Sequence, residues 1–102
     1  MKRRFTLSPD AASDLEEIRD WVIADGGPRV ALHVIRSLLK AIRLLAQSPN
    51  LGHTRKDLTD LPLKFWPVFS WLIVYDATRS PIEVVRVLHA ARNLPRILSG
   101  RT

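Results

Sequence analysis

The stretch "SPDAASDLEEIRDWVIADGGPRVALHVIRSLLKAIRLLAQSP", residues 8–49, holds two helix patterns joined by a short turn, and it decides the fold class. Ser8 is suited to cap a helix, Pro9 has no N–H to leave unpaired in the first turn, and Asp10 suits the positive helix end. The sequence "DGG" at 25–27 ends this first helix. Its apolar residues recur at spacings of four, three and four, which places them on one face: Ala11, Leu15, Ile18 and Val22.

Pro28 opens a second amphipathic helix. Its apolar residues share one face, and four cations lie almost opposite as a solvated basic stripe. The apolar face consists of Ala31, Val34, Ile35, Leu38, Ile42 and Leu45, and the stripe consists of Arg29, Arg36, Lys40 and Arg43. Two amphipathic helices joined by a few residues predict an antiparallel helical hairpin that buries its apolar seam against another layer.

Strand patterns on both sides of the hairpin can provide that layer. Alternating or continuously apolar segments predict strands at 2–7, 63–67, 68–76 and 82–90. Pro67 marks a tight turn or a bulge between two of these segments, because it cannot donate to a strand ladder. The segment "NLPRIL" at 93–98 predicts a final helical turn. The order is β-α-α-β-β-β, so we expect an α+β fold in which a helical hairpin packs on a largely antiparallel sheet.

The composition is that of a small, basic protein without cysteine. Its 102 residues are 46% hydrophobic and 25% charged, so we expect a single globular domain over residues 1–102. Residues 1–25 carry four Lys/Arg against six Asp/Glu, a balance of −2, whereas residues 26–102 carry twelve against four, a balance of +8. This excess of cations favours an anionic partner such as nucleic acid, the ribosome or an acidic protein. No cysteine, signal-peptide core or apolar run of the roughly 20 residues in a membrane span is present, so we expect a cytoplasmic protein that binds no membrane.

The stretch "IEVVRVLHAARN", residues 82–93, is an apolar strand that ends in polar groups. Strict alternation places Arg86 on one face of this strand and His89 on the other. Burying an unpaired guanidinium is costly, so we expect Arg86 to point away from the helices; an arginine on an open sheet face, or one paired with Glu83 or Asp76, fits equally well. His89 has the chemistry of a general acid or base, but a hydrogen-bonded residue at a strand end is the commoner role.

Aromatic residues accompany the cations of the second half of the chain. Cations and aromatic rings together can hold phosphates and stack bases. Four aromatic or aliphatic residues nevertheless occur at every second position, as on one face of a strand, which is more typical of a core: Phe69, Trp71, Ile73 and Tyr75. His33 and His53 are scattered, and no nucleotide-binding loop is present, so we expect neither a cofactor nor a metal.

Four segments of the chain form a recognisable series: "FTLSPDAASDLEEIRDWV" at 5–22, "SPNLGH" at 48–53, "WLIVYD" at 71–76 and "VVRVLHAARN" at 84–93. Their most distinctive parts are the Leu-Ser-Pro-x-Ala-x-x-Asp-Leu opening, the Ser-Pro-x-Leu-Gly loop and the Val-Leu-His-x-x-Arg ending. Taken together and in order, these segments resemble the ParE/RelE family of bacterial toxins from type II toxin–antitoxin modules. The resemblance implies the β-α-α-β-β-β fold and a cytoplasmic toxin that a cognate antitoxin neutralises by folding an acidic and apolar segment around it.

The family has two functional branches, and this sequence is more similar to the ParE branch. ParE-like members generally inhibit DNA gyrase without a catalytic act, which is the function we expect. RelE-like members cleave messenger RNA on the ribosome with clustered basic residues, and that alternative assigns catalysis to Lys64, Arg86, His89 and Arg92. In either case the candidates for contact with the antitoxin or the target are Arg55, Lys64, Arg86, Arg92 and Arg96.

Overall fold

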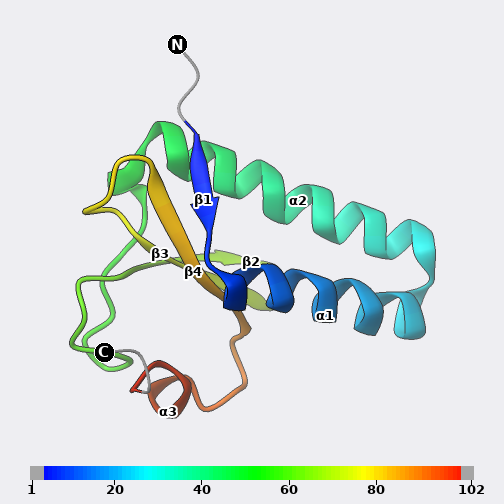
Figure 1. Ribbon diagram of the computed structural model, residues 1–102. Coiled ribbons are helices and arrows are strands. Elements are labelled where there is room, and N and C mark those ends of the chain that lie inside the picture. The colour runs from blue at the N-terminus through cyan, green and yellow to red at the C-terminus, as the bar shows by residue number, and fades with distance from the viewer. Residues whose placement is uncertain (1–3, 100–102) are drawn as a thin grey trace.

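The computed structural model describes residues 4–99 as a layered arrangement of helices and strands (Figure 1). The helical elements are α1 (Pro9–Gly26), α2 (Pro28–Gln47), the short 3-10 turn η1 (Pro49–Leu51) and α3 (Leu94–Ser99). The strands are β1 (Phe5–Leu7), β2 (Lys64–Val68), β3 (Trp71–Asp76) and β4 (Ile82–His89). The predicted order of elements is confirmed, including the last helical turn. Of the strand predicted at 2–7, residues 2 and 3 lie outside the described part of the chain.

The four strands form one sheet in the order β1-β4-β3-β2. β1 runs parallel to β4, while the β2–β3 and β3–β4 pairs are antiparallel, so the prediction of a largely antiparallel sheet is confirmed. β4 is therefore a central strand that joins the first strand of the chain to the β2–β3 hairpin. None of the helices in residues 4–99 combines the length and the apolar character that crossing a membrane requires.

The helical hairpin begins and turns where the sequence indicates. Ser8 caps α1, because its Oγ accepts a hydrogen bond of 3.0 Å from the backbone N–H of Ala11. Gly27 ends α1 and starts α2 with a φ of 89°, a left-handed conformation that an L side chain adopts only with strain. Pro28 follows in the first position of α2, where no N–H is needed.

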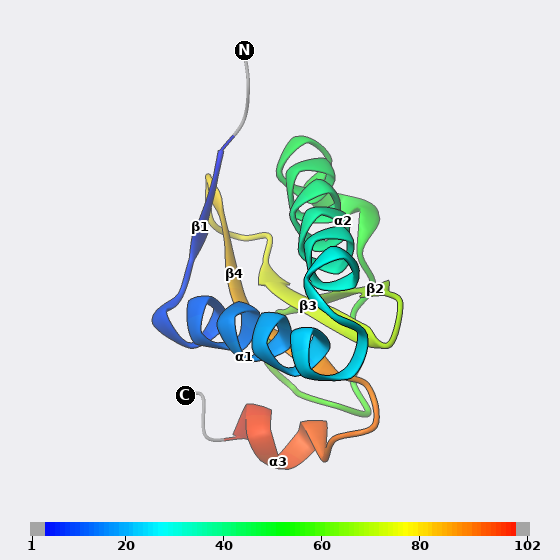
Figure 2. The same cartoon turned by 90° about the vertical axis from the view of Figure 1, so that its right-hand side faces the viewer.

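The main core lies between this hairpin and one face of the sheet (Figure 2). Ala11, Ile18 and Val22 of α1 are buried, and Leu15 is partly buried against them, as predicted. On α2 the predicted face is buried except for Ile35, which is half-buried; the buried members are Ala31, Val34, Leu38, Ile42 and Leu45. The amphipathic spacing alone therefore identified the helical side of the core.

A second core on the opposite face of the sheet was not predicted. There α3 and the loop before β2 cover side chains from three strands, and the buried members are Leu63, Phe65, Leu72, Val74, Val85, Leu88, Leu94 and Leu98. The hairpin therefore covers one face of the sheet and α3 covers part of the other.

The turn between β2 and β3 corrects the strand boundary predicted at Pro67. The turn consists of Phe69 and Ser70, because Val68 pairs with Trp71. Pro67 instead lies within β2, an edge strand, where a residue without an N–H is tolerated. Phe69 was expected in the core but is 61% exposed with a φ of 54°, whereas the other three residues of that predicted face are buried: Trp71, Ile73 and Tyr75.

A β-bulge in β4 corrects the predicted faces of that strand. Tyr75 pairs with Val84 and Val74 pairs with Arg86, so Val85 is an extra residue without a partner on β3. Val85 consequently packs in the second core, while Val84 and Val87 both pack under the helices. Strict alternation would have put Val84 and Val87 on opposite faces.

Candidate functional site

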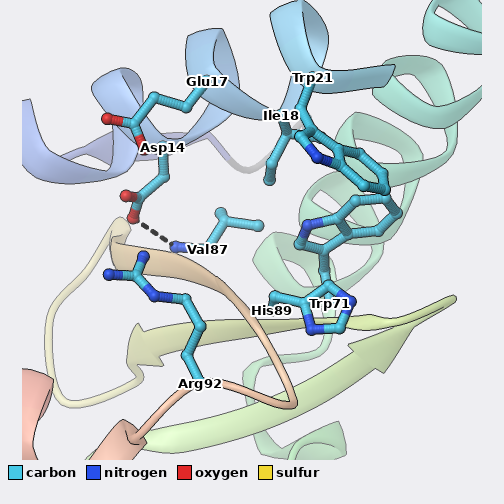
Figure 3. Close-up of a pocket in the computed structure, with 8 residues that line it drawn as sticks. All are labelled: Asp14, Glu17, Ile18, Trp21, Trp71, Val87, His89 and Arg92. Atoms are coloured by element: carbon cyan, nitrogen blue, oxygen red, sulfur yellow. Dashed lines mark hydrogen bonds between the residues drawn. The ribbon is translucent and has the colours of Figure 1, made fainter. Parts of the chain in front are cut away.

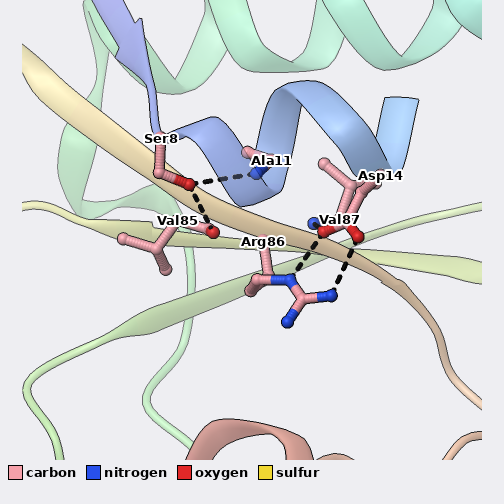
Figure 4. Close-up of polar contacts among 6 residues, drawn as sticks. All are labelled: Ser8, Ala11, Asp14, Val85, Arg86 and Val87. Atoms are coloured by element: carbon pink, nitrogen blue, oxygen red, sulfur yellow. Dashed lines mark hydrogen bonds and ion pairs between the residues drawn. The ribbon is translucent and has the colours of Figure 1, made fainter. Parts of the chain in front are cut away.

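The part of β4 beyond the reach of β1 is hydrogen-bonded by α1 instead of by another strand (Figure 4). β1 pairs only with residues 82–84 of β4. From there the backbone N–H of Ser8 donates to the carbonyl of Val84 at 2.9 Å, and its Oγ donates to the carbonyl of Val85 at 2.8 Å. The carboxylate of Asp14, six residues further along the chain in α1, accepts from the N–H of Val87 at 2.9 Å. The N-cap residue Ser8 and the side chain of Asp14 thus replace a neighbouring strand along this edge.

The same carboxylate holds the guanidinium of Arg86. Arg86 Nε lies 2.8 Å from one oxygen of Asp14, and its terminal nitrogen lies 2.9 Å from the other, a bidentate geometry. Asp14 is only 4% exposed. The hydrogen bonds that Arg86 donates to this carboxylate raise the pKa of Arg86 above its ordinary value, against the opposing effect of partial burial.

The expectation that Arg86 points away from the helices, or pairs with Glu83 or Asp76, is therefore wrong. The guanidinium turns towards α1 for two reasons. The bulge at Val85 shifts the position of Arg86 along the strand edge, and the buried carboxylate of Asp14 lies within ion-pair distance there. Sequence reasoning missed Asp14 as its partner. A signal was present, since Asp14 lies three residues after Ala11 and four before Ile18, which puts an acidic side chain on the buried face of the helix.

Beside this ion pair lies an open pocket of about 390 Å³ between α1 and the end of the sheet (Figure 3). Three rings line one side of it in series: the Trp21 and Trp71 ring centroids are 6.5 Å apart, and those of Trp71 and His89 are 5.9 Å apart, both pairs edge to face. Trp21 is 60% exposed, which is unusual for so large an apolar side chain. The lining residues are Asp14, Glu17, Ile18, Trp21, Trp71, Val87, His89 and Arg92.

His89 and Arg92 are the two candidate site residues that line this pocket. The Nδ1 of His89 accepts a hydrogen bond of 3.1 Å from the backbone N–H of Ala91, so the proton of the neutral ring is on Nε2. Arg92 follows the end of β4, and its side chain extends towards Asp14 of α1 (Figure 3). The pocket thus joins an aromatic wall to an exposed guanidinium, a combination suited to an apolar side chain with a nearby anionic group.

The other candidates lie elsewhere. Lys64 pairs with Tyr75 and His89 pairs with Trp71, so the two are offset by four positions along β3, roughly 13 Å. Arg55 is exposed in the loop after η1. It holds Asp57 through hydrogen bonds of 2.9 and 2.7 Å, which lower the pKa of that carboxyl.

Arg96 is exposed on α3, which packs on the far face of the sheet from the hairpin. The fold therefore brings His89 and Arg92 together in one pocket, and Arg86 is linked to that pocket because it pairs with the lining residue Asp14. The other three candidates lie apart from it: Arg55, Lys64 and Arg96. Within residues 4–99, no three His, Asp or Glu side chains converge in a way that could hold a metal ion.

The Ser-Pro-x-Leu-Gly loop has a structural explanation. The hydroxyl of Tyr75 accepts from the N–H of Gly52 at 2.9 Å and donates to the carbonyl of Pro49 at 2.7 Å. A Cβ on Gly52 would stand 2.5 Å from that hydroxyl, so only glycine allows this approach. Burial raises the pKa of Tyr75 above its ordinary value, and the hydrogen bond from Gly52 opposes the shift. The loop thus fastens the end of α2 to the middle of the sheet.

Comparisons with known proteins point in one direction. Residues 5–94 match the family model described as the ParE toxin of the type II toxin–antitoxin system, parDE. The chain is 33% identical over 99 residues to the protein named Toxin ParE1 in two strains of Mycobacterium tuberculosis, covering 96% of this chain and all of the relative. The fold is similar to a solved chain described as the chromosomal ParDE TA system from P. aeruginosa, with a TM-score of 0.72 and 20% identity over 86% of this chain and 96% of that one.

Proposed function

The chain belongs to the ParE toxin family of type II toxin–antitoxin systems, and from this membership we propose that it inhibits DNA gyrase and is neutralised by a cognate antitoxin. The observation that carries the proposal is a family relationship that extends over nearly the whole chain, 96% of it in the case of the mycobacterial Toxin ParE1. Gyrase acts in the cytoplasm, so that is the compartment in which we propose the protein works.

The positions of the basic residues support a toxin that binds rather than cleaves. Ribosome-dependent cleavage of RNA needs several cations and a proton carrier around one phosphate. Lys64 lies about 13 Å along the sheet from His89. The guanidinium of Arg86 is already held by Asp14 through two hydrogen bonds. Neither residue is placed to share a phosphate with His89.

The antitoxin, in this proposal, covers the pocket beside α1. A largely apolar segment with an acidic group opposite Arg92 suits the pocket, because Trp21 offers exposed apolar area and Arg92 offers a cation at its rim. Glu17 on the α1 side of the pocket disfavours further acidic groups there. Arg55, Lys64 and Arg96 are proposed as further contacts with the antitoxin or with gyrase. A segment that folds as it binds would explain both tight neutralisation and release after proteolysis.

Supercoiling by purified gyrase is the direct test of the target. Increasing amounts of the folded toxin should progressively reduce the conversion of relaxed plasmid to the supercoiled form, and adding the antitoxin in equal amount should restore it. Unchanged supercoiling at saturating toxin, in a protein that still arrests growth when expressed, would reject gyrase as the target.

The proposed antitoxin surface has its own test. The double variant Trp21→Ala/Arg92→Ala should bind the antitoxin at least tenfold more weakly, since interface anchors of these residue types commonly contribute 2 kcal/mol or more. The matched control is Arg19→Ala, which removes an exposed cation from the same helix but lies outside the pocket. Equal affinities of the two variants, measured by calorimetry on folded proteins, would place the antitoxin on another surface.

A further inference from the structure

Four cations form a straight row on the outer face of α2, and neither the pocket nor the family relationship accounts for them. From this row we propose that α2 binds the phosphate backbone of duplex DNA, a contact that does not depend on gyrase being the target. The row consists of Arg29, Arg36, Lys40 and Arg43.

The geometry of α2 aligns the row. At 100° per residue the four Cα positions fall within an arc of about 60°, and the row extends for about 21 Å at a rise of 1.5 Å per residue. All four side chains are exposed, and no carboxylate within residues 4–99 lies within ion-pair distance of any of them. The opposite side of α2 is fixed in the main core, so the row is mounted on a rigid support.

No other element covers this face. α2 packs on the sheet and against α1, and the side turned away from the sheet has no helix or strand over it in the described part of the chain (Figures 1 and 2). The row is therefore open to a large partner.

The distribution of charge favours a polyanion that contacts one side of the molecule. Residues 26–56 contain no Asp or Glu at all. The neighbouring α1 carries the opposite sign, with exposed carboxylates at Asp10, Glu16, Glu17, Asp20 and Asp25. A duplex with its dense negative charge would be attracted to α2 and repelled by α1, so the hairpin would present α2 to it in one orientation.

A peptide partner fits this row less well than a phosphate backbone does. A bound amphipathic helix needs apolar anchors at intervals of three or four residues along a groove. Exposed apolar side chains of α2 flank the row on both sides, with Leu32 on one side and Val30 and Leu44 on the other. Val30 and Leu44 are fourteen residues apart, about 21 Å, so these side chains form no continuous seam. Evenly oriented long cations without apolar anchors suit the regular phosphates of a nucleic acid, whose backbone is recognised without reading the bases.

The salt dependence of binding to a fluorescently labelled duplex of arbitrary sequence tests this surface. With four phosphate contacts, log Kd should rise with log salt concentration with a slope of about 3.6. The triple variant Arg36→Gln/Lys40→Gln/Arg43→Gln should reduce the slope to about 0.9. If the two lines meet at 1 M salt, binding in 0.1 M salt should weaken by roughly 500-fold. The exposed positions of these residues mean that the variant should fold, which circular dichroism would verify.

The matched control removes three cations elsewhere: Arg4→Gln/Arg19→Gln/Arg79→Gln, all exposed and none on α2. This control has the same net charge and should keep a slope near that of the unchanged protein. Equal losses in the two triple variants would show that overall charge, not the row, drives binding. Absence of duplex binding would overturn the proposal. If polyglutamate bound in the same titration while the duplex did not, the row would be assigned to an acidic protein instead.

Discussion

Asp14 is the residue on which the arrangement around β4 depends most directly. One carboxylate group accepts a backbone N–H from Val87 and both arms of the Arg86 guanidinium, at 2.8 to 2.9 Å. A buried donor that loses its acceptor, and a guanidinium that loses its anion, are both costly. We therefore expect Asp14 mainly to stabilise the fold. Its effect on the neighbouring pocket should be indirect, by holding α1 and β4 in position.

Replacing Asp14 with alanine should lower the free energy of unfolding by about 3 kcal/mol, because Arg86 and the Val87 N–H would both lose their partner. Urea denaturation followed by circular dichroism measures this. Asp20→Ala is the control, since Asp20 is exposed on the same helix and its pair with Arg19 is a surface one, so a change within about 0.5 kcal/mol is expected. A loss below about 1 kcal/mol for the Asp14 variant would mean that water replaces the carboxylate at little cost.

Tyr75 should make the stability of the folded protein depend on pH in the alkaline range. Its pKa is raised above the ordinary value of 10.0 by burial, so the folded state favours the protonated phenol. The contribution to stability is fully present below pH 10 and is lost as the pH rises through the higher pKa of the folded protein. Denaturation midpoints measured across this range should fall on the alkaline side.

Tyr75→Phe separates this effect from the titration of lysines. At neutral pH the variant should be less stable by about 1–3 kcal/mol, because the buried N–H of Gly52 loses its acceptor. At alkaline pH the difference between the two proteins should shrink, since only one of them still has a phenol to ionise. Parallel curves across the whole range would contradict the assignment.

Among the elements, α2 contributes most visibly to the main core. Leu38 lies at the middle of its buried face with no exposed surface, so Leu38→Ala should cost about 2–5 kcal/mol. Leu32 is 50% exposed on the same helix, and Leu32→Ala serves as a control with an expected change within about 0.5 kcal/mol. A loss below 0.5 kcal/mol for Leu38→Ala, in thermal or urea unfolding, would mean that the helix packs differently.

The helices could be predicted from sequence more completely than the strands. Ser8, Pro9 and the recurring apolar positions act within one or two helical turns, so local rules identify the start and the buried face of α1. The faces of β4 depend on a bulge opposite Val74 and Tyr75, which alternation within one strand cannot reveal. Phe69 was misplaced for a related reason, since the position of a two-residue turn follows from strand pairing and not from composition.

In the whole molecule, the features that escaped prediction join distant parts of the chain. Asp14 and Arg86 are 72 residues apart, and no local sequence pattern indicates that they pair. Residue type alone groups the candidate cations, yet the fold places Lys64, Arg92 and Arg96 in different regions. The difference in net charge between the first and the later part of the chain could be predicted from the sequence, because counting charged side chains requires no knowledge of their contacts.

The central position of β4 also bears on the time at which the protein acquires its shape during synthesis. Both β1 and β3 pair with this strand, and α1 closes its remaining edge, yet β4 comes after all three of these elements in the chain. A growing chain on the ribosome therefore lacks the strand that joins its two halves until β4 has been synthesised. The sheet can close only from that point onwards, which gives a partner made beforehand the chance to bind the toxin as soon as its fold is complete.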